Sequence, residues 1–195
     1  EKVEEEIAGQ FPAAKVERLD FDTARTRTAY ERIISDFEKG KTQILIGTQM
    51  LSKGLDFGNV SVVGILSADS LMNFPDFRAH ERAYQLMVQV SGRAGRRDKR
   101  GTVILQTTQP EHPLIRMVQH FAYKEMVSLQ LSERSMFRYP PYYRLIVLIL
   151  RSRNEEALQE MSALYAEKLR ARLGERVLGP VTPPITRVQT LHIKK

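Results

Sequence analysis

The sequence predicts an α/β fold with a parallel sheet, followed by a smaller α+β segment. Two short apolar runs, residues 43–47 and 60–66, are typical of strands buried on both faces, as in parallel sheets. Apolar residues at helical spacing place one helix over 28–39 and another over 77–91. Strands and helices that alternate through short connections favour a parallel sheet, and the functional loops of such a sheet leave the carboxyl ends of its strands.

The first 111 residues supply most of these elements. The apolar pattern predicts one more helix over 2–10 and further strands over 15–20 and 102–107. Gly40 is expected to stop the helix over 28–39, because glycine readily adopts the left-handed conformation that follows many helices. We therefore expect residues 1–111 to form one α/β domain.

A different pattern begins after this domain. Residues 112–136 have a helical pattern, so we expect linking helices over 112–139. The adjacent Pro140 and Pro141 predict a boundary, because neither residue can continue a helix. A partial second domain is expected over 140–195.

This second domain is predicted to be small. A strand is expected over 143–152, and residues 177–181 and 187–194 add one or two more. Between them a helix is predicted from Asn154, a suitable N-cap, to Gly174, which closes it. Such a β-α-β segment is too small to bury a core independently.

Composition excludes several classes of site. The chain of 195 residues carries a net charge of +7, which favours a polyanionic partner. It contains no cysteine, so disulfides and thiolate metal sites are excluded, and its four histidines lack metal-ligand spacing; we expect no metal site. The longest apolar run, 145–150, is too short to cross a membrane, and the acidic start of the chain is unlike a signal peptide. These features predict a cytoplasmic protein without a membrane partner.

The stretch QVSGRAGR carries the strongest chemical signal. Arg93 and Arg96 lie three residues apart, and a guanidinium matches a phosphoryl group with a rigid fork of donors. The alternative is a helix end at which both arginines bind backbone carbonyls. The chain has no phosphate-binding G-x-x-x-x-G-K-[ST] loop, because Ser35 stands where the first glycine before Gly40-Lys41-Thr42 is required. A phosphate for these arginines would have to be held elsewhere.

A second motif, ILIGTQMLSKGLDF, follows a predicted buried strand. Thr48 and Gln49 present a hydroxyl and an amide at the end of that strand, where they can hold a phosphate backbone. Gly54 permits a tight turn, and Asp56 can accept hydrogen bonds from ribose hydroxyls. By itself this motif could be an ordinary strand–turn–helix connection, but its position before QVSGRAGR points to a nucleotide and nucleic-acid site.

Together the two motifs resemble motifs V and VI of the superfamily 2 helicases. Within that superfamily the strings DFRAHERAYQLMVQVSGRAGR, VILQTTQPEHPLI and VLGPV resemble the replication-restart, or primosomal, helicases. Many superfamily members have arginine where this chain has Val90, and an apolar residue there fits the replication-restart group. The resemblance implies the second of two RecA-like lobes, with ATP and Mg²⁺ held mainly by a first lobe outside this sequence.

The resemblance also implies roles for single residues. Arg93 and Arg96 correspond to arginines that reach the γ-phosphate of ATP and act in catalysis. The other nucleotide-binding positions are Gln89, Gly54 and Asp56. The positions that contact the backbone of single-stranded DNA are Thr48, Gln49 and Lys53.

For a complete protein of this group, the resemblance implies remodelling of stalled or branched replication forks and initiation of primosome assembly. It would be a bacterial, nucleoid-associated monomer with an upstream zinc insertion that binds DNA forks, single-strand-binding protein and other primosome proteins. The present stretch alone should hydrolyse no ATP. Its last segment would form the first part of a C-terminal domain similar to a small ribosomal-subunit protein.

Several alternatives stay open at this stage. The chain could be a basic nucleic-acid-binding module without a motor role, or the second lobe of another translocase such as a RecG-like enzyme. The segment from Asp76 to Arg82 suits either a local ion pair with lobe packing or a DNA contact. Three tyrosines beside Arg138 and Arg144 could stack on bases or pack a domain junction: Tyr139, Tyr142 and Tyr143. Asp69 follows a predicted strand, but without a base or metal partner it is assigned to a loop.

Overall fold

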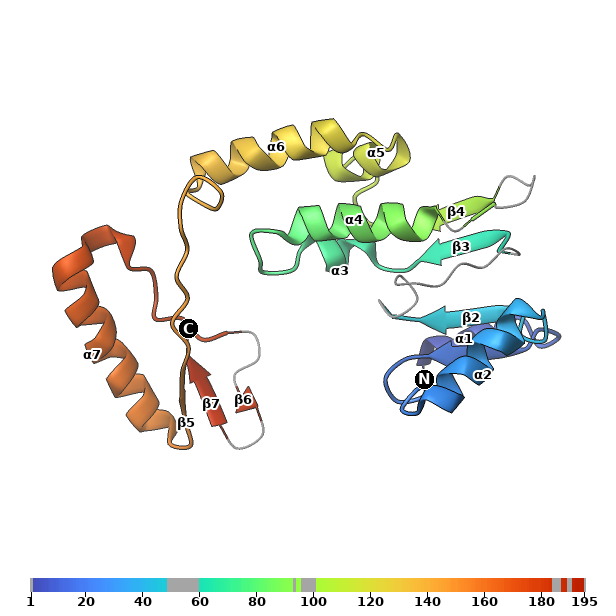
Figure 1. Cartoon of the computed structure of the whole chain (residues 1–195), viewed down its shortest axis with the longest axis horizontal. Helices are drawn as coiled ribbons and strands as arrows, with labels where there is room; N and C mark the ends of the chain where they lie inside the picture. The colour runs from blue at the N-terminus through green and yellow to red at the C-terminus, as the bar shows by residue number, and fades with distance from the viewer. Residues whose placement is uncertain are drawn as a thin grey trace. The chain divides into compact units, whose positions relative to one another are not determined.

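The computed structural model describes residues 2–48, 60–92, 94–95, 101–183, 187–188 and 191–194. The chain divides into two compact units, residues 1–138 and 139–195, and each is described by itself. Figure 1 shows the helices and strands of both units.

The first unit begins with a parallel strand pair covered by helices. Strand β1 (Val16–Leu19) pairs with β2 (Ile44–Gly47), and Leu19 lies opposite Gly47. Helices α1 (Lys2–Gln10) and α2 (Arg27–Glu38) pack against β1, and Leu19 and Ile33 are buried there. All four elements were predicted, and Gly40 has the left-handed conformation (φ +71°) expected just beyond α2.

A second parallel pair follows. Strand β3 (Val62–Ile65) pairs with β4 (Thr102–Leu105), with Ile65 opposite Leu105. The prediction that β3 would be buried on both faces is wrong. Its side chains alternate between part-buried and exposed positions, because Ile65 packs against helices while Val62 on the other face is more than half exposed.

Helices lie between and after these two strands along the chain. They are α3 (Ala68–Met72), α4 (Ala79–Ser91), α5 (Pro113–Gln119) and α6 (Tyr123–Met136). Helix α4 confirms the prediction over 77–91, whereas α3 was not predicted. The helical stretch predicted over 112–136 is divided into α5 and α6 at Phe121, whose φ is +52°.

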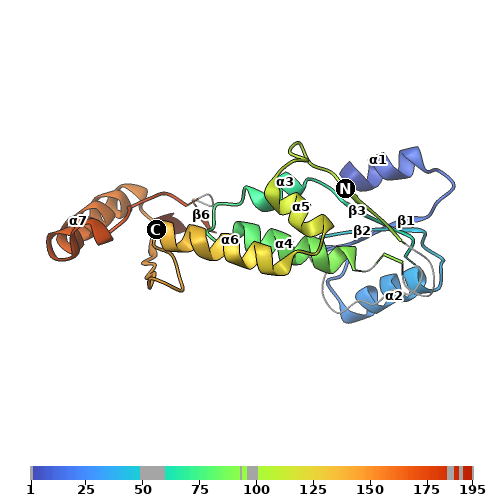
Figure 2. The same cartoon turned by 90° about the horizontal axis from the view of Figure 1, so that it is seen from above.

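One apolar core joins these helices to the strands. Its buried side chains come from all four helices, and Ile65 and Leu105 of the sheet pack against it. Helix α4 lies against α3, α5 and α6, and Figure 2 shows α6 running alongside α4. Met87 of α4 is fully buried in this core. Burial of this apolar surface holds one face of α4 against the core.

In the described part of the second unit, three antiparallel strands pack with one long helix. The strand order is β5 (Leu150–Ser152), β7 (Leu191–Lys194) and β6 (Arg187–Val188). Helix α7 (Glu155–Leu173) packs against β5 and β7 and is followed by a 3₁₀ turn, Gly174–Arg176. The side chain of Asn154 accepts a hydrogen bond from the Ala157 N–H, so the predicted cap is confirmed.

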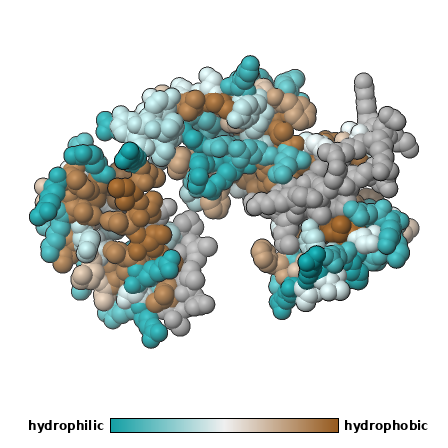
Figure 3. Space-filling model, in the orientation of Figure 1, coloured by the Kyte–Doolittle hydropathy of each residue, from teal (hydrophilic) through white to brown (hydrophobic). Residues whose placement is uncertain are grey.

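Two strand predictions in this unit are wrong or incomplete. Only residues 150–152 of the strand expected over 143–152 form a strand, and residues 177–181 form none. The apolar side chains of residues 145–149 are 44–83% exposed. An apolar run becomes a strand only when another strand pairs with it. Of the stretch 143–152, only residues 150–152 pair with another described strand, β7. Figure 3 shows apolar surface on this unit.

Candidate nucleotide and nucleic-acid site

Of the eight predicted site residues, the structure describes two, Thr48 and Gln89. The other six (Gln49, Lys53, Gly54, Asp56, Arg93 and Arg96) lie outside the described residues. The geometry of the site is therefore given by the elements that lead into the two motifs.

The first motif begins at the carboxyl end of β2. Thr48 follows Gly47 directly and is exposed. Because β1 and β2 are parallel and Leu19 lies opposite Gly47, the turn after β1 leaves the sheet at the same edge. The edge at which Thr48 stands is thus also bordered by residues 20–26.

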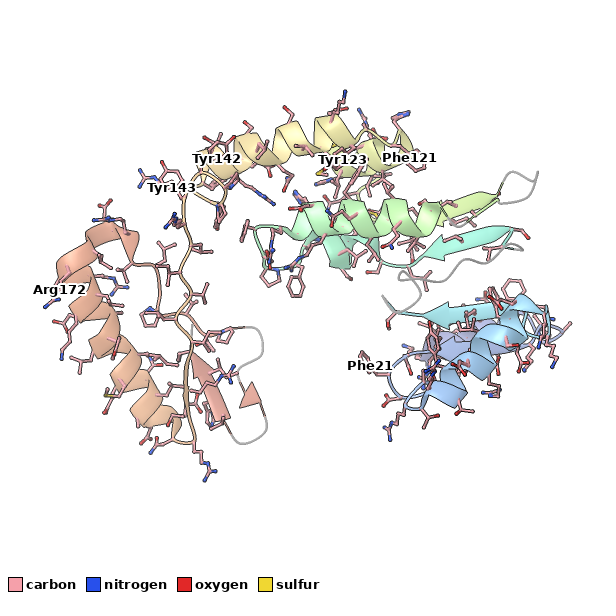
Figure 4. The ribbon with its side chains drawn as sticks, in the orientation of Figure 1. Phe21, Phe121, Tyr123, Tyr142, Tyr143 and Arg172 are labelled. Carbon is pink, nitrogen blue, oxygen red and sulfur yellow. The ribbon has the colours of Figure 1, made fainter. Side chains whose placement is uncertain are left out.

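That turn after β1 is held by one carboxylate. The Asp20 Oδ1 atom accepts hydrogen bonds from the N–H groups of Asp22 and Thr23, both at 3.0 Å. The Thr23 backbone donor is the main reason that the pKa of Asp20 is lowered. The turn exposes Phe21, whose side chain projects from it in Figure 4 and is 83% exposed. Sequence reasoning assigned nothing to Phe21, and no motif identified it.

The second motif begins on the last turn of α4. Gln89 is exposed there, whereas Ala83, Tyr84 and Met87 face the core. The helix ends at Ser91, where the Gly92 N–H donates to the Val88 carbonyl at 3.0 Å. The chain therefore leaves a firmly packed helix immediately before position 93.

The residue before the second arginine of the motif is also fixed. The Gly95 N–H donates to the Val60 carbonyl at 3.1 Å, which ties the segment after α4 to the chain just before β3. Gly95 has φ +85°, a conformation that residues with a Cβ atom rarely adopt. This requirement explains the glycine between the two arginines.

Asp69 has a structural role at the neighbouring strand ends. Its carboxylate accepts a hydrogen bond from the Thr107 hydroxyl at 2.8 Å and another from the Thr108 N–H at 2.9 Å. The Thr108 N–H is the largest cause of the lowered pKa of Asp69. These bonds join the start of α3 to the segment after β4. The assignment of Asp69 to a loop is wrong, because the residue lies in the first turn of α3.

The segment from Asp76 to Arg82 contains the local ion pairs that one of the two sequence interpretations expects. Asp76 accepts a hydrogen bond from the Arg78 N–H at 2.8 Å and pairs with the Arg82 guanidinium at 2.9 Å. Burial opposes ionisation of Asp76, yet these donors and the charges of Arg78 and Arg82 lower its pKa overall. The segment also contacts α6, because Arg134 pairs with Glu81.

Aromatic side chains at the start of the second unit are accessible. Tyr142 and Tyr143 are about half exposed, and Figure 4 shows them where the chain follows α6. Phenol rings with this exposure can stack on nucleobases. Their contact with DNA stays a prediction.

Neither a metal-binding cluster nor a membrane-spanning helix occurs among the described residues. Among the described residues, no group of three or more His, Asp or Glu side chains is arranged to hold a metal ion. No helix in the described part of the chain is long and apolar enough to span a membrane.

Comparison with known proteins defines the class first. Residues 2–98 match the helicase conserved C-terminal domain, which covers both motifs and fits the RecA-like α/β fold with parallel strands. This unit is therefore a helicase C-terminal lobe. Residues 135–192 match the primosomal protein N C-terminal domain.

Individual relatives then identify the family. The chain is 44% identical over 195 residues to the replication restart protein PriA of Bacillus subtilis (strain 168), covering 97% of the chain and 24% of that protein. It is 40% identical over 191 residues to the PriA protein of Synechocystis, covering 96% of the chain and 23% of that protein. The chain belongs to the PriA family of superfamily 2 helicases and spans about a quarter of the length of these relatives.

Proposed function

We propose that this chain is the second motor lobe, with part of the following domain, of an ATP-dependent DNA helicase that acts in replication restart and primosome assembly. The observation that carries the proposal is the order of the two family matches, a helicase lobe over 2–98 followed by a primosomal domain over 135–192. A RecG-like translocase or a basic module without a motor role would not be expected to match both.

The chemical proposal concerns the arginine motif. Arg93 and Arg96 stabilise the charge that develops on the γ-phosphate, as guanidinium groups do in other phosphoryl-transfer enzymes. ATP and Mg²⁺ are held mainly by the first lobe, and Gln89 and Asp56 bind on the nucleotide side. Gly54 provides the turn just before Asp56. The position of α4 supports this assignment, because this core-packed helix contains Gln89 and ends at Ser91, two positions before Arg93.

The remaining assignments concern DNA and partners. Thr48, Gln49 and Lys53 contact the backbone of single-stranded DNA, and Thr48 stands exposed at a carboxyl strand edge, as such a role requires. We propose domains over 1–111, 112–139 and 140–195. In the full-length protein we further propose a bound zinc, contacts with single-strand-binding protein, a monomeric state and a cytoplasmic location near the nucleoid.

The test uses the full-length protein and substitutions in the arginine motif. Arg93→Ala or Arg96→Ala should abolish DNA-stimulated ATP hydrolysis, because loss of a transition-state contact raises the activation free energy by several kcal/mol. DNA affinity should fall less than about twofold. A matched control is Arg116→Ala, an exposed arginine on α5. Equal loss of ATP turnover and DNA affinity in the motif variants would favour the module without a motor role.

A further inference from the structure

A part-buried ion pair joins helices α4 and α6 of the first unit. Arg134, in the last turn of α6, donates from Nη2 to Oε2 of Glu81, in the first turn of α4, at 2.5 Å. The two side chains are only 15% and 32% exposed. An exposed pair contributes little, whereas removal of one partner of a buried pair leaves an uncompensated charge.

The same guanidinium holds the segment that leads into α4. The Arg134 Cζ atom lies 5.2 Å from the centre of the Phe77 ring, within the range of a cation–π contact. Phe77 precedes α4 by two residues, so Arg134 contacts both the entry and the first turn of the helix. We call Phe77, Glu81 and Arg134 the α4 clamp. The Asp76–Arg82 pair stiffens the same entry from within.

The far end of α4 carries the arginine motif. The helix has 13 residues, so it extends roughly 20 Å at about 1.5 Å per residue. Its end at Ser91 is separated from position 93 by Gly92 alone. A helix moves largely as a rigid element. If the α4 clamp is lost, the first turn of α4 can tilt or shift along the helix axis, and this displacement also moves the residues just beyond Ser91.

We propose that Arg134 is a positioning residue for ATP hydrolysis: through Glu81 and Phe77 it sets the axial position of α4 and thereby where Arg93 and Arg96 stand. This inference rests on the proposed function of those two arginines. A misplacement of about 1 Å at a reacting group can cost about 10²-fold in rate. Arg134 itself lies at the opposite end of α4 from the motif, so its effect is indirect.

The experiment compares variants of the full-length protein in steady-state ATP hydrolysis with saturating single-stranded DNA. Arg134→Met removes the charge but keeps an apolar stem, and we expect kcat to fall about tenfold or more while KM for ATP changes less than about twofold. Glu81→Gln should shift kcat in the same direction. Arg134→Lys keeps the charge but loses the planar fork, so it should restore only part of the loss.

The matched control is Arg116→Met on α5. Arg116 pairs with Glu111, but both side chains are more than half exposed, so kcat should stay within about twofold of wild type. Thermal unfolding of every variant reports whether the fold is retained. If Arg134→Met does not fold, Glu81→Gln, the milder change, provides the same kinetic comparison.

The outcomes separate this inference from the function on which it rests. Wild-type kcat in folded Arg134→Met, or loss of kcat only in proportion to loss of folded protein, overturns the positioning role. If Arg93→Ala abolishes turnover in the same assay, the proposed function survives that result. If the wild-type protein shows no DNA-stimulated hydrolysis, or Arg93→Ala hydrolyses ATP normally, the proposed function fails and this inference fails with it.

Discussion

Replacing one buried methionine should reveal how firmly the core holds α4. Met87 is 0% exposed and lies among side chains from α3, α5 and α6, whereas Met136, at the end of α6, is 73% exposed. Met87→Ala removes the same atoms as Met136→Ala, but only the former leaves a cavity in a close-packed interior. Comparison of the two variants therefore isolates the effect of burial on the free energy of unfolding, because the same side-chain atoms are removed in both.

The expected cost of Met87→Ala is about 2–5 kcal/mol of unfolding free energy, the range for truncation of a large buried side chain. Met136→Ala should change stability by less than about 0.5 kcal/mol, as exposed substitutions do. The cost at Met87 is a large part of the roughly 5–15 kcal/mol that stabilises a typical domain.

Urea unfolding followed by circular dichroism gives both values. The slope with urea concentration should be equal in the two variants, because the surface exposed on unfolding is unchanged. A loss at Met87 no larger than the loss at Met136 would refute the packing of α4 described above. It would also remove the physical reason to expect that the end of α4 at Ser91 is firmly held.

Two other substitutions test local features of the first unit. The pKa of His112 is lowered because burial and the neighbouring His80 oppose its positive charge, and the charges of Glu133 and Asp69 offset these effects only in part. The Nδ1 atom of His112 also caps α5, because it accepts a hydrogen bond from the Leu114 N–H at 3.1 Å. The unfolded chain then takes up a proton at higher pH than the folded one, so the free energy of unfolding should fall as pH drops below about 6.5, by roughly 1 kcal/mol once the cap is lost. In urea titrations at pH 7.5 and 5.5, His112→Asn should reduce this loss of stability, whereas the exposed His120→Asn should not. Equal behaviour of the two variants would contradict this role of His112. In the same assay, Gly40→Ala should lower the free energy of unfolding by about 1 kcal/mol, because φ at this position is +71°. Gly9→Ala, inside α1 with open space around it, should leave stability unchanged or raise it. An unchanged stability of Gly40→Ala would refute the left-handed turn.

The sequence predicted elements whose signals are local. Helices α2, α4 and α7 have apolar residues at helical spacing, and Asn154 and Gly40 mark ends that the structure confirms. Such signals depend on residues within a few positions of each other, so they can be recognised without the fold.

The errors arise where distant residues decide the structure. The apolar run at 145–149 indicates burial, but strand formation requires a partner strand that no local pattern specifies. The five-residue helix α3 is too short to show periodicity. The break between α5 and α6 falls at Phe121, which has a positive φ. Phenylalanine is not a typical turn residue, so no local signal in the sequence indicated this break.

Around the candidate site, the sequence predicted the strand and helix that lead into the two motifs, but not the contacts that support them. Thr48 and Gln89 lie at a strand end and on the last turn of a helix, as the pattern around them indicated. The contact between Glu81 and Arg134 joins residues 53 positions apart and depends on the crossing of α4 and α6. Only the structure could bring these two charges together.

The central claim is that Arg93 and Arg96 contact the γ-phosphate in the transition state of ATP hydrolysis. The most direct measurement is the affinity of the full-length protein for ADP with aluminium fluoride, a transition-state analogue, compared with its affinity for ADP alone. Arg93→Ala should lose about 10²-fold or more in affinity for the analogue and leave ADP binding nearly unchanged, because the lost interaction forms only with the transferring phosphoryl group. Equal affinity of wild type and variant for the analogue would contradict the claim.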